Sequence, residues 1–544
     1  MALITTCLGV GVSVVAPALP AAGAIYVPIS GAGSTWSENA IDQWRANVRQ
    51  YGMTINYSGT GSSDGRNQFR NGTVDFAVSE IPYGIKDSGV VDPPPARKYA
   101  YMPIVAGGTS FMYNLTIGNQ RVTNLRLSGR VITEIFTGVI KTWNDPAIKA
   151  DNPALAAALP ARTIVPVVRS DGSGTTAQFS TWMSKQYPAL WNTYCAKAGR
   201  STPCGTTSNY PLVAGSNFVS QSGSNGVSGY VAQAGNVGAI TYVEYSYAKF
   251  TTGFPVVKVL NAAGYYTEPT APNVAVALLK AQINNNPSSP SYLTQILDNV
   301  YNDGDPRTYP LSSYSYMILP TALESNFNTQ KGKTLGAFGY YFLCEGQQHV
   351  ADLGYSPLPI NLVQAAFSQL RKIPGVSVEN IVISSCHNPT FSNNGTNTLA
   401  ATAPYPASCD KQGATQCSAG TGGATTPTTI GAGSGSGAGT GSGSGNGTGS
   451  GSRPGSGSGP SGTGSSANPS STRGTAINPD TGLPIGTTGS GGSGGTIAAV
   501  PVSTSESIGT GLEHALMALA GLLLLMVIVG PPLLSRYFAR RKAS

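Results

Sequence analysis

Charge is scarce in this 544-residue sequence, because Asp, Glu, Lys and Arg together make up only 10% of it, against about 25% in an ordinary soluble domain. Histidine occurs three times, and none of the seven cysteines forms a CxxC pair. We therefore expect no metal site of the usual Cys/His kind. Basic residues do not cluster with aromatic ones, and four of the eight net positive charges lie within the last nine residues. That distribution argues against a nucleic-acid partner.

Motifs of two enzyme classes are absent or weak. Lys333-Thr334 lacks the glycine spacing of a Walker A loop, so the chain does not resemble a P-loop ATPase. The segment GSSDG at 61–65 fits the G-x-S-x-G pattern, with Ser63 at the nucleophile position and Asp75 and His387 as triad partners. The same pattern arises from composition alone in the Gly/Ser-rich part of the chain. We therefore expect no enzyme and no cofactor, with a hydrolase as the alternative.

The N-terminus has the layout of a secretory signal peptide. Residues 3–16 are apolar, and two prolines and the small residues Ala22-Gly23-Ala24 follow them. The first basic residue is Arg45, so the usual positive segment is missing. We expect residues 1–24 to be a signal peptide and the remaining chain to leave the cytoplasm.

Two further segments follow the body of the chain. Residues 418–510 hold 28 of the 69 glycines and four charged residues, which predicts a disordered Gly/Ser/Thr-rich linker. Residues 515–534 are apolar without a charge, enough to span a bilayer core of about 30 Å. The basic residues after them place the C-terminus in the cytoplasm. We expect a single-pass cell membrane protein, with residues 25–417 outside, a transmembrane helix at 511–534 and a cytoplasmic tail at 535–544.

Six cysteines remain after removal of the signal peptide. They are Cys195, Cys204, Cys344, Cys386, Cys409 and Cys417. An even number in an extracytoplasmic protein indicates disulfides. Pairing of sequence neighbours gives 195–204, 344–386 and 409–417, which is one of the many connectivities that six cysteines allow.

The body of the chain alternates between strand-like and helix-like segments. Runs of Val, Ile, Tyr and Phe predict strands at 54–57, 74–78, 101–105, 110–114 and 164–168. Helices are predicted at 37–51, 65–71, 175–185, 273–285 and 361–372. This order predicts an α/β fold with a largely parallel sheet, whose ligand site lies at the carboxyl ends of the strands.

Three Gly/Ser/Thr-rich loops stand at such strand ends, each just before a predicted helix. They are Gly31–Ser37, Ser58–Gly65 and Arg169–Thr176. Backbone N–H groups, hydroxyls and helix N-termini all favour a bound anion. One loop of this kind commonly does no more than cap a helix. Three that converge, with Arg169 as a bidentate donor, would enclose a tetrahedral oxyanion.

Six stretches of the sequence resemble a known family. They are GAGSTW (31–36), NYSGTGSSDG (56–65), VDFAVSE (74–80), FTGVIKTWND (136–145), VVRSDGSGTT (167–176) and GAITYVEYSYA (238–248). In this order they resemble the substrate-binding protein of the bacterial phosphate ABC transporter, from about residue 28 to 370. The resemblance implies a two-lobed, type II-like periplasmic binding protein fold that closes over one inorganic phosphate. Lobe one would comprise 28–102 plus 268–400, and lobe two 103–267.

The resemblance also implies partners and ligand-binding residues. The partners are the ABC permease and ATPase subunits. The phosphate ligands are Thr35, the Trp36 amide, Ser62, Arg169, Ser173, Gly174 and Thr175, with Asp171 orienting Arg169. The alternative is a membrane-tethered surface-interaction or oxyanion-sensing protein that reuses the fold.

Two positions depart from the family pattern. Glu80 stands where the family has an aspartate that accepts a proton from the ligand and thereby rejects sulfate. Its side chain is one methylene longer, so selectivity for phosphate over sulfate stays open. Asp64 replaces a usual glycine, and we expect it to cap the following helix, with repulsion of a divalent ligand as the alternative.

Overall fold

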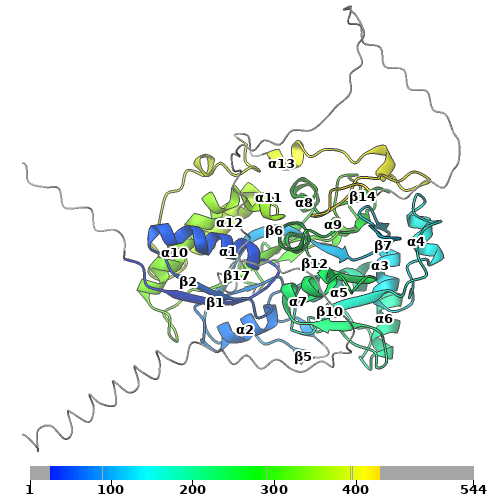
Figure 1. The fold of residues 1–544 in the computed structure, drawn as a ribbon. Helices are drawn as coiled ribbons and strands as arrows, with labels where there is room; N and C mark the ends of the chain where they lie inside the picture. Colours follow the sequence, from blue (N-terminus) through cyan, green and yellow to red (C-terminus); the bar gives the residue numbers. More distant parts are fainter. Residues whose placement is uncertain (1–24, 88–89, 290, 393, 395, 429–544) are drawn as a thin grey trace, which may run out of the picture. The chain divides into compact units, whose positions relative to one another are not determined.

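The structure is a computed structural model that describes residues 25–428 except 88–89, 290, 393 and 395 (Figure 1). An eight-stranded sheet forms its centre, in the order β11-β10-β12-β6-β17-β3-β1-β2. These strands are β1 (Ile29–Gly33), β2 (Ile55–Ser58), β3 (Phe76–Ser79), β6 (Tyr99–Tyr113), β10 (Val165–Arg169), β11 (Val219–Gln221), β12 (Ala239–Glu244) and β17 (Ser312–Pro320). Short strands form smaller sheets in the described chain. One has three strands in the order β14-β13-β9 (Tyr266–Thr267, Lys258–Leu260, Arg126–Leu127). The others are two-stranded: β15-β16 (Gln282–Ile283, Gln295–Ile296), β4-β5 (Lys86–Asp87, Val90–Val91) and β7-β8 (Thr116–Ile117, Gln120–Arg121).

Helices pack around the central sheet, and Figure 1 shows α1, α10 and α12 toward the β1 end and α3, α5 and α6 toward the β10 end. The α-helices are α1 (Glu38–Asn47), α2 (Ser62–Arg70), α3 (Gly129–Phe136), α4 (Pro146–Asp151), α5 (Gly174–Gln186), α6 (Pro188–Lys197), α7 (Gly223–Ala232), α8 (Ala271–Leu278), α9 (Asp298–Tyr301), α10 (Thr329–Leu343), α11 (Val350–Leu353), α12 (Ile360–Leu370) and α13 (Thr398–Ala401). Shorter helical turns are η1 (Val48–Tyr51), η2 (Tyr247–Thr252), η3 (Glu345–Gln347), η4 (Ile383–Cys386) and η5 (Ser408–Asp410).

The central strands β6 and β17 make the sheet mixed, so the expectation of a largely parallel sheet is wrong at its centre. At one end of the sheet β1, β2 and β3 pair with one another in parallel, and at the other end β10, β11 and β12 do the same. Between them β6 and β17 run antiparallel to each other and to the strands beside them. β6 pairs with β17 as far as Gly108 and with β12 from Thr109. The chain therefore passes there from the half of the sheet that holds β1 to β3 to the half that holds β10 to β12. We call these halves, with the helices packed on them, lobe one and lobe two.

Strand β6 also corrects two predicted strands. The segments predicted separately at 101–105 and 110–114 are parts of one strand, Tyr99–Tyr113. Gly107 and Gly108 lie inside it because the backbone is closely covered there. A Cβ at Gly107 would lie 2.8 Å from the Trp36 ring, and a Cβ at Gly108 would lie 2.4 Å from Pro269. These glycines allow close packing and do not form a turn.

The helix predicted at 273–285 ends earlier than expected. α8 stops at Leu278, and Gln282–Ile283 form strand β15. The Asn284 side chain accepts a hydrogen bond from the Asn286 backbone N–H (3.1 Å), a local bond that competes with helix formation. The helix predicted at 65–71 starts at Ser62 instead. The other predicted strands and helices are found close to their predicted bounds.

The cysteines pair as sequence neighbours. The disulfides are Cys195–Cys204, Cys344–Cys386 and Cys409–Cys417. The first lies in lobe two and the second in lobe one. The third closes a short loop near the end of the described chain.

The chain returns from lobe one to lobe two after α13. We call residues 408–428 the C-terminal strap. Asp410 of the strap pairs with Lys258 of β13 at 2.8 Å. Thr421 is buried, and its hydroxyl lies within hydrogen-bonding distance of the Thr123 carbonyl (3.0 Å). The boundary between body and linker expected at 417 is therefore too early, because packed residues continue beyond it.

The calls on membrane targeting fall largely outside the described residues. The signal peptide (1–24), the membrane helix (511–534), the tail (535–544) and the linker beyond 428 all lie there. Within the described part of the chain, none of the helices is both long and apolar enough to span a membrane.

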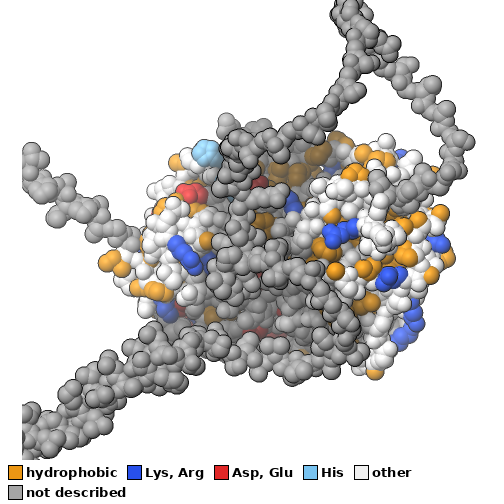
Figure 2. All heavy atoms as spheres, viewed as in Figure 1, with side chains coloured by type: hydrophobic (Ala, Val, Ile, Leu, Met, Phe, Trp, Pro, Cys, Tyr) orange, Lys and Arg blue, Asp and Glu red, His pale blue; other side chains and the backbone are white. Residues whose placement is uncertain are grey.

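Charge is sparse on the visible described surface. Figure 2 shows Lys and Arg side chains singly or in small groups among larger areas of uncharged polar side chains and backbone. This agrees with the 10% charged content of the sequence.

Candidate functional site

Four loops meet between the lobes, each at the carboxyl end of a parallel strand. They follow β1, β2, β10 and β11 and lead into α1, α2, α5 and α7. The lobes touch at this junction: the Ser63 N–H donates to the Gly172 carbonyl (3.0 Å), and Gln178 Nε2 of α5 donates to the carbonyl of Glu80, which follows β3 (2.8 Å). The three loops predicted from the sequence thus converge, and the loop at 221–224 joins them as a fourth.

Arg169 lies at this junction with only 3% of its surface exposed. Its Nε donates to Asp171 Oδ1 at 2.7 Å, and its Nη2 pairs with the other carboxylate oxygen. Burial acts to raise the pKa of Asp171, but the hydrogen bond and charge of Arg169 outweigh it and hold that pKa below its ordinary value. The carboxylate therefore stays ionised and fixes the plane of the guanidinium.

The third loop supplies the N-terminus of α5. Ser173 Oγ accepts a hydrogen bond from the first turn of the helix (3.1 Å), and the Gly174 N–H donates across the lobes to Ser62 Oγ (3.2 Å). A Cβ at Gly174 would lie 2.0 Å from Glu80 Oε2, so a larger residue does not fit. Within the described residues, the buried Thr175 hydroxyl has no hydrogen-bond partner.

Glu80 is buried on the lobe-one side of the site and is held by three hydroxyl groups. Its Oε1 accepts from Ser34 Oγ (2.5 Å) and Ser315 Oγ (2.8 Å). Its Oε2 accepts from Ser62 Oγ (2.7 Å). In this structure the Ser62 hydroxyl, which the family resemblance gives to phosphate, thus donates to the carboxylate.

The first loop joins lobe two through Thr35. Thr35 Oγ1 lies 2.8 Å from Ser224 Oγ and accepts from the Ser224 N–H (3.1 Å). The Trp36 amide, expected to bind the anion, donates to Ser34 Oγ (2.9 Å). That same hydroxyl donates to Glu80, so the first loop also supports the carboxylate.

The residues predicted for the site come together at the lobe junction. Thr35, Trp36, Ser62, Glu80, Arg169, Ser173, Gly174 and Thr175 are all buried there. Sequence reasoning missed Ser34, Gln178, Ser224 and Ser315. Ser224 had a usable signal, because QSGS at 221–224 repeats the Gly/Ser pattern between a short strand and a helix. Ser315 had none, since it lies inside the buried strand β17 and in no loop that precedes a helix.

Other candidate residues lie away from the junction or serve local structure. Asp75 forms an ion pair with Lys331 (2.8 Å), and His387 is exposed, which gives the hydrolase alternative no support. Asp64 is exposed and accepts from Gln68 Nε2 (2.5 Å). It lies in the first turn of α2, where its negative charge is near the helix N-terminus, as expected for a capping residue.

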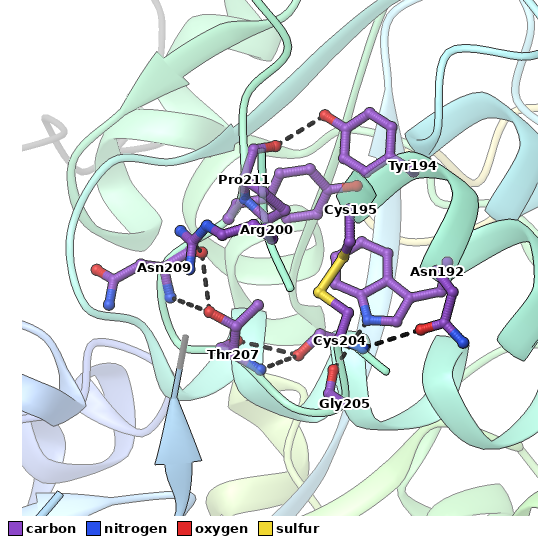
Figure 3. Close-up of a disulfide and its surroundings, with 12 residues drawn as sticks. Asn192, Tyr194, Cys195, Arg200, Cys204, Gly205, Thr207, Asn209 and Pro211 are labelled. Atoms are coloured by element: carbon purple, nitrogen blue, oxygen red, sulfur yellow. Dashed lines mark hydrogen bonds between the residues drawn. A yellow bond between two sulfur atoms is a disulfide. The ribbon is translucent and has the colours of Figure 1, made fainter. Parts of the chain in front are cut away.

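A disulfide holds the segment that supports the third loop. Figure 3 shows Cys195 of α6 bonded to Cys204 in the segment that follows this helix. A few residues further, the Ser208 carbonyl accepts from the Ser173 N–H (2.9 Å), and Ser208 Oγ accepts from Ser63 Oγ (3.0 Å). The disulfide-bound segment therefore contacts both lobes at the edge of the site.

Comparison with known proteins places this site in a family. A model of the PBP superfamily domain matches residues 16–345. The phosphate-binding protein PstS of Xylella fastidiosa is 33% identical over 339 residues, covering 62% of this chain and 83% of that protein. PstS of Haemophilus influenzae is 29% identical over 342 residues, covering 63% and 92%. A solved periplasmic phosphate-binding protein aligns with a TM-score of 0.47 and 17% identity, covering 65% of this chain and 100% of that one.

The family match includes all four loops of the site and ends before the C-terminal strap. It covers more than half of the chain, and the Xylella relative is matched over most of its own length. The chain belongs to the PBP superfamily, as a relative of the PstS phosphate-binding proteins.

Proposed function

We propose that this protein is an extracytoplasmic solute-binding protein that captures inorganic phosphate and delivers it to the permease and ATPase subunits of an ABC importer. The relatives are phosphate-binding proteins by name. The lobe junction has the donors that a phosphate ion needs, and binding there involves no chemical step.

One observation carries the proposal: donors from both lobes converge around Arg169. Asp171 holds the guanidinium in a fixed plane, and the loops add hydroxyl and N–H groups at helix N-termini. The Thr175 hydroxyl is buried among them and has no partner within the part of the chain that the structure describes, although buried polar groups are nearly always hydrogen-bonded. A tetrahedral oxyanion at this position would accept from Arg169, Thr175 and the N–H groups of the third loop.

Phosphate binding would redirect two hydrogen bonds near Glu80. In the structure the Ser62 hydroxyl donates to Glu80, and the Gly174 N–H donates to Ser62. A phosphate oxygen would take over both donors, and Glu80 would accept the proton of monohydrogen phosphate. Sulfate has no such proton near neutral pH, so its oxygen would face the carboxylate without a shared hydrogen.

We also propose that the protein is exported and tethered to the cell membrane. The support is the apolar stretch and small residues before residue 25, the apolar run 515–534, and the basic tail after it. The Gly/Ser-rich residues from 429 to 510 would separate the binding lobes from that anchor.

Titration calorimetry of the purified full-length protein with phosphate, and then with sulfate, tests the ligand. Tight phosphate binding without sulfate heat supports phosphate capture and shows that glutamate replaces the family's aspartate. Comparable binding of both ions would contradict selectivity through Glu80. No heat from either ion, with the protein folded, would overturn phosphate capture and favour the surface-interaction alternative.

A further inference from the structure

Ser224 lies near the start of α7, at the end of the fourth loop. It belongs to lobe two and is fully buried. Its N–H donates to Thr35 Oγ1 of lobe one (3.1 Å), and the two hydroxyl oxygens lie 2.8 Å apart. Arg169 Nη1 donates to Ser224 Oγ (3.4 Å). Ser224 therefore stands between the charged group of the site and a proposed phosphate ligand.

Either hydroxyl of the Ser224–Thr35 pair can be the donor, and the donors and acceptors of these three residues allow the following arrangement. A guanidinium only donates, so Ser224 Oγ accepts from Arg169 and can turn its own hydrogen toward Thr35. Thr35 Oγ1 then accepts from both the N–H and the O–H of Ser224, which fills its two lone pairs. The Thr35 hydrogen remains to donate elsewhere.

From this geometry we propose that Ser224 is a positioning residue of the anion site. It relays the polarity of Arg169 through two hydroxyl groups to Thr35, whose hydrogen then points to the bound anion. Each bond in such a chain polarises the next. The chain crosses from lobe two to lobe one, so it forms only when the lobes close. The inference rests on the proposed function, because Thr35 is a proposed phosphate ligand.

Ser224→Ala in the full-length protein removes the relaying hydroxyl and keeps the backbone N–H. We expect about a tenfold loss of phosphate affinity, mostly as faster release, because one buried hydrogen bond between the closed lobes is lost. The matched control is Ser228→Ala, on the same helix and also buried. Among the described residues, Ser228 Oγ donates only to backbone carbonyls of α7, so the phosphate affinity of this variant should stay unchanged.

A double-mutant cycle separates positioning from a general structural role. If Ser224 acts through Thr35, adding Ser224→Ala to Thr35→Ala should cost less than about twofold in phosphate affinity. A structural defect would cost the same factor in both backgrounds. Ser224→Cys, close in size and a weak donor, should show an intermediate loss and provides a second measurement.

The results distinguish this inference from the proposed function. Wild-type protein that binds no phosphate overturns the proposed function, and the inference with it. Wild-type protein that binds phosphate, with Ser224→Ala unchanged or with equal losses in both backgrounds, overturns the inference alone. The inference is supported if Ser224→Ala weakens phosphate binding in the protein that keeps Thr35 but not in the Thr35→Ala variant.

Discussion

At the scale of single residues, Arg169 is the buried cation that the proposed function makes the main ligand of the anion. Arg169→Ala should weaken phosphate binding at least about a hundredfold, because charge-assisted hydrogen bonds to a desolvated anion are lost. Titration calorimetry measures the change. Arg162→Ala is the control, since Arg162 is an exposed lobe-two residue bonded to the Val237 carbonyl.

The Arg169 variant also leaves the half-buried Asp171 carboxylate without its counter-charge, so the free energy of unfolding of the variant should fall by roughly 1–3 kcal/mol. The double variant Arg169→Ala/Asp171→Ala should regain much of that stability and none of the affinity. Phosphate binding by the double variant at wild-type strength would refute the role of Arg169.

Glu38 should make stability fall as pH rises. Burial, with the nearby charge of Asp42, raises the pKa of Glu38 from 4.5 to about 7. Between these values the folded state binds more protons than the unfolded state, so the free energy of unfolding decreases with rising pH and stays lower above about pH 7. Glu38→Gln should remove this slope, and its gain at about pH 8 should be roughly 1–3 kcal/mol.

Urea unfolding of wild type and Glu38→Gln at about pH 5 and about pH 8 measures the slope. Glu379→Gln, at an exposed position, should keep the wild-type dependence and serves as the control. An identical slope in wild type and Glu38→Gln would show that another group titrates.

At the scale of elements, strand–loop–helix units were predictable, but their partners were not. The unit around Arg169 has local signals: a Val-rich run, then glycines and serines, then a helix. The antiparallel direction of β6 and β17 depends on chain segments about two hundred residues apart, for which no local signal exists. Ser315 reaches Glu80 of the site because β17 is placed in the sheet by that pairing. The contact between Glu80 and Ser62 depends on side-chain length and conformation, which sequence pattern does not give.

The segment closed by Cys195 and Cys204 should affect phosphate binding as well as stability. Replacing both cysteines by alanine frees the chain before Ser208, which contacts Ser173 and Ser63. We expect a stability loss of roughly 2–3 kcal/mol and phosphate affinity several-fold weaker.

The matched control replaces Cys344 and Cys386, which join α10 to η4 in lobe one. That variant should also lose stability, while its affinity stays close to wild type. Thermal unfolding and calorimetry measure both quantities, and equal affinities in the two variants would contradict a specific role for the 195–204 segment.

At the scale of the whole described body, three chain segments join the two lobes. The chain crosses in β6, again at residues 268–270, and again at 404–407 before the C-terminal strap. The strap also reaches the second crossing, because the Gly422 N–H donates to Glu268 Oε1 (2.7 Å). The family match ends at residue 345, so the third crossing lies outside the matched residues.

The third crossing should restrict how far the lobes open. On lobe one the Arg307 guanidinium donates to the Ala403 carbonyl (3.4 Å), and on lobe two Asp410 pairs with Lys258. The chain between these points is short and contains two prolines. Inserting about ten Gly/Ser residues after Ala403 keeps both anchors but lengthens the link. Phosphate affinity should then fall about 3- to 10-fold, because the ligand-free protein gains open conformations that binding must give up.

Calorimetry measures this loss, and stopped-flow release of phosphate shows whether the lobes separate faster. The same insertion placed after Thr428 lies beyond the strap and should leave both quantities unchanged. Equal affinities for the two insertion variants would mean that the strap only covers lobe two. A loss confined to the insertion after Ala403 would mean that this chain tunes a phosphate-binding fold through a tether outside the matched domain.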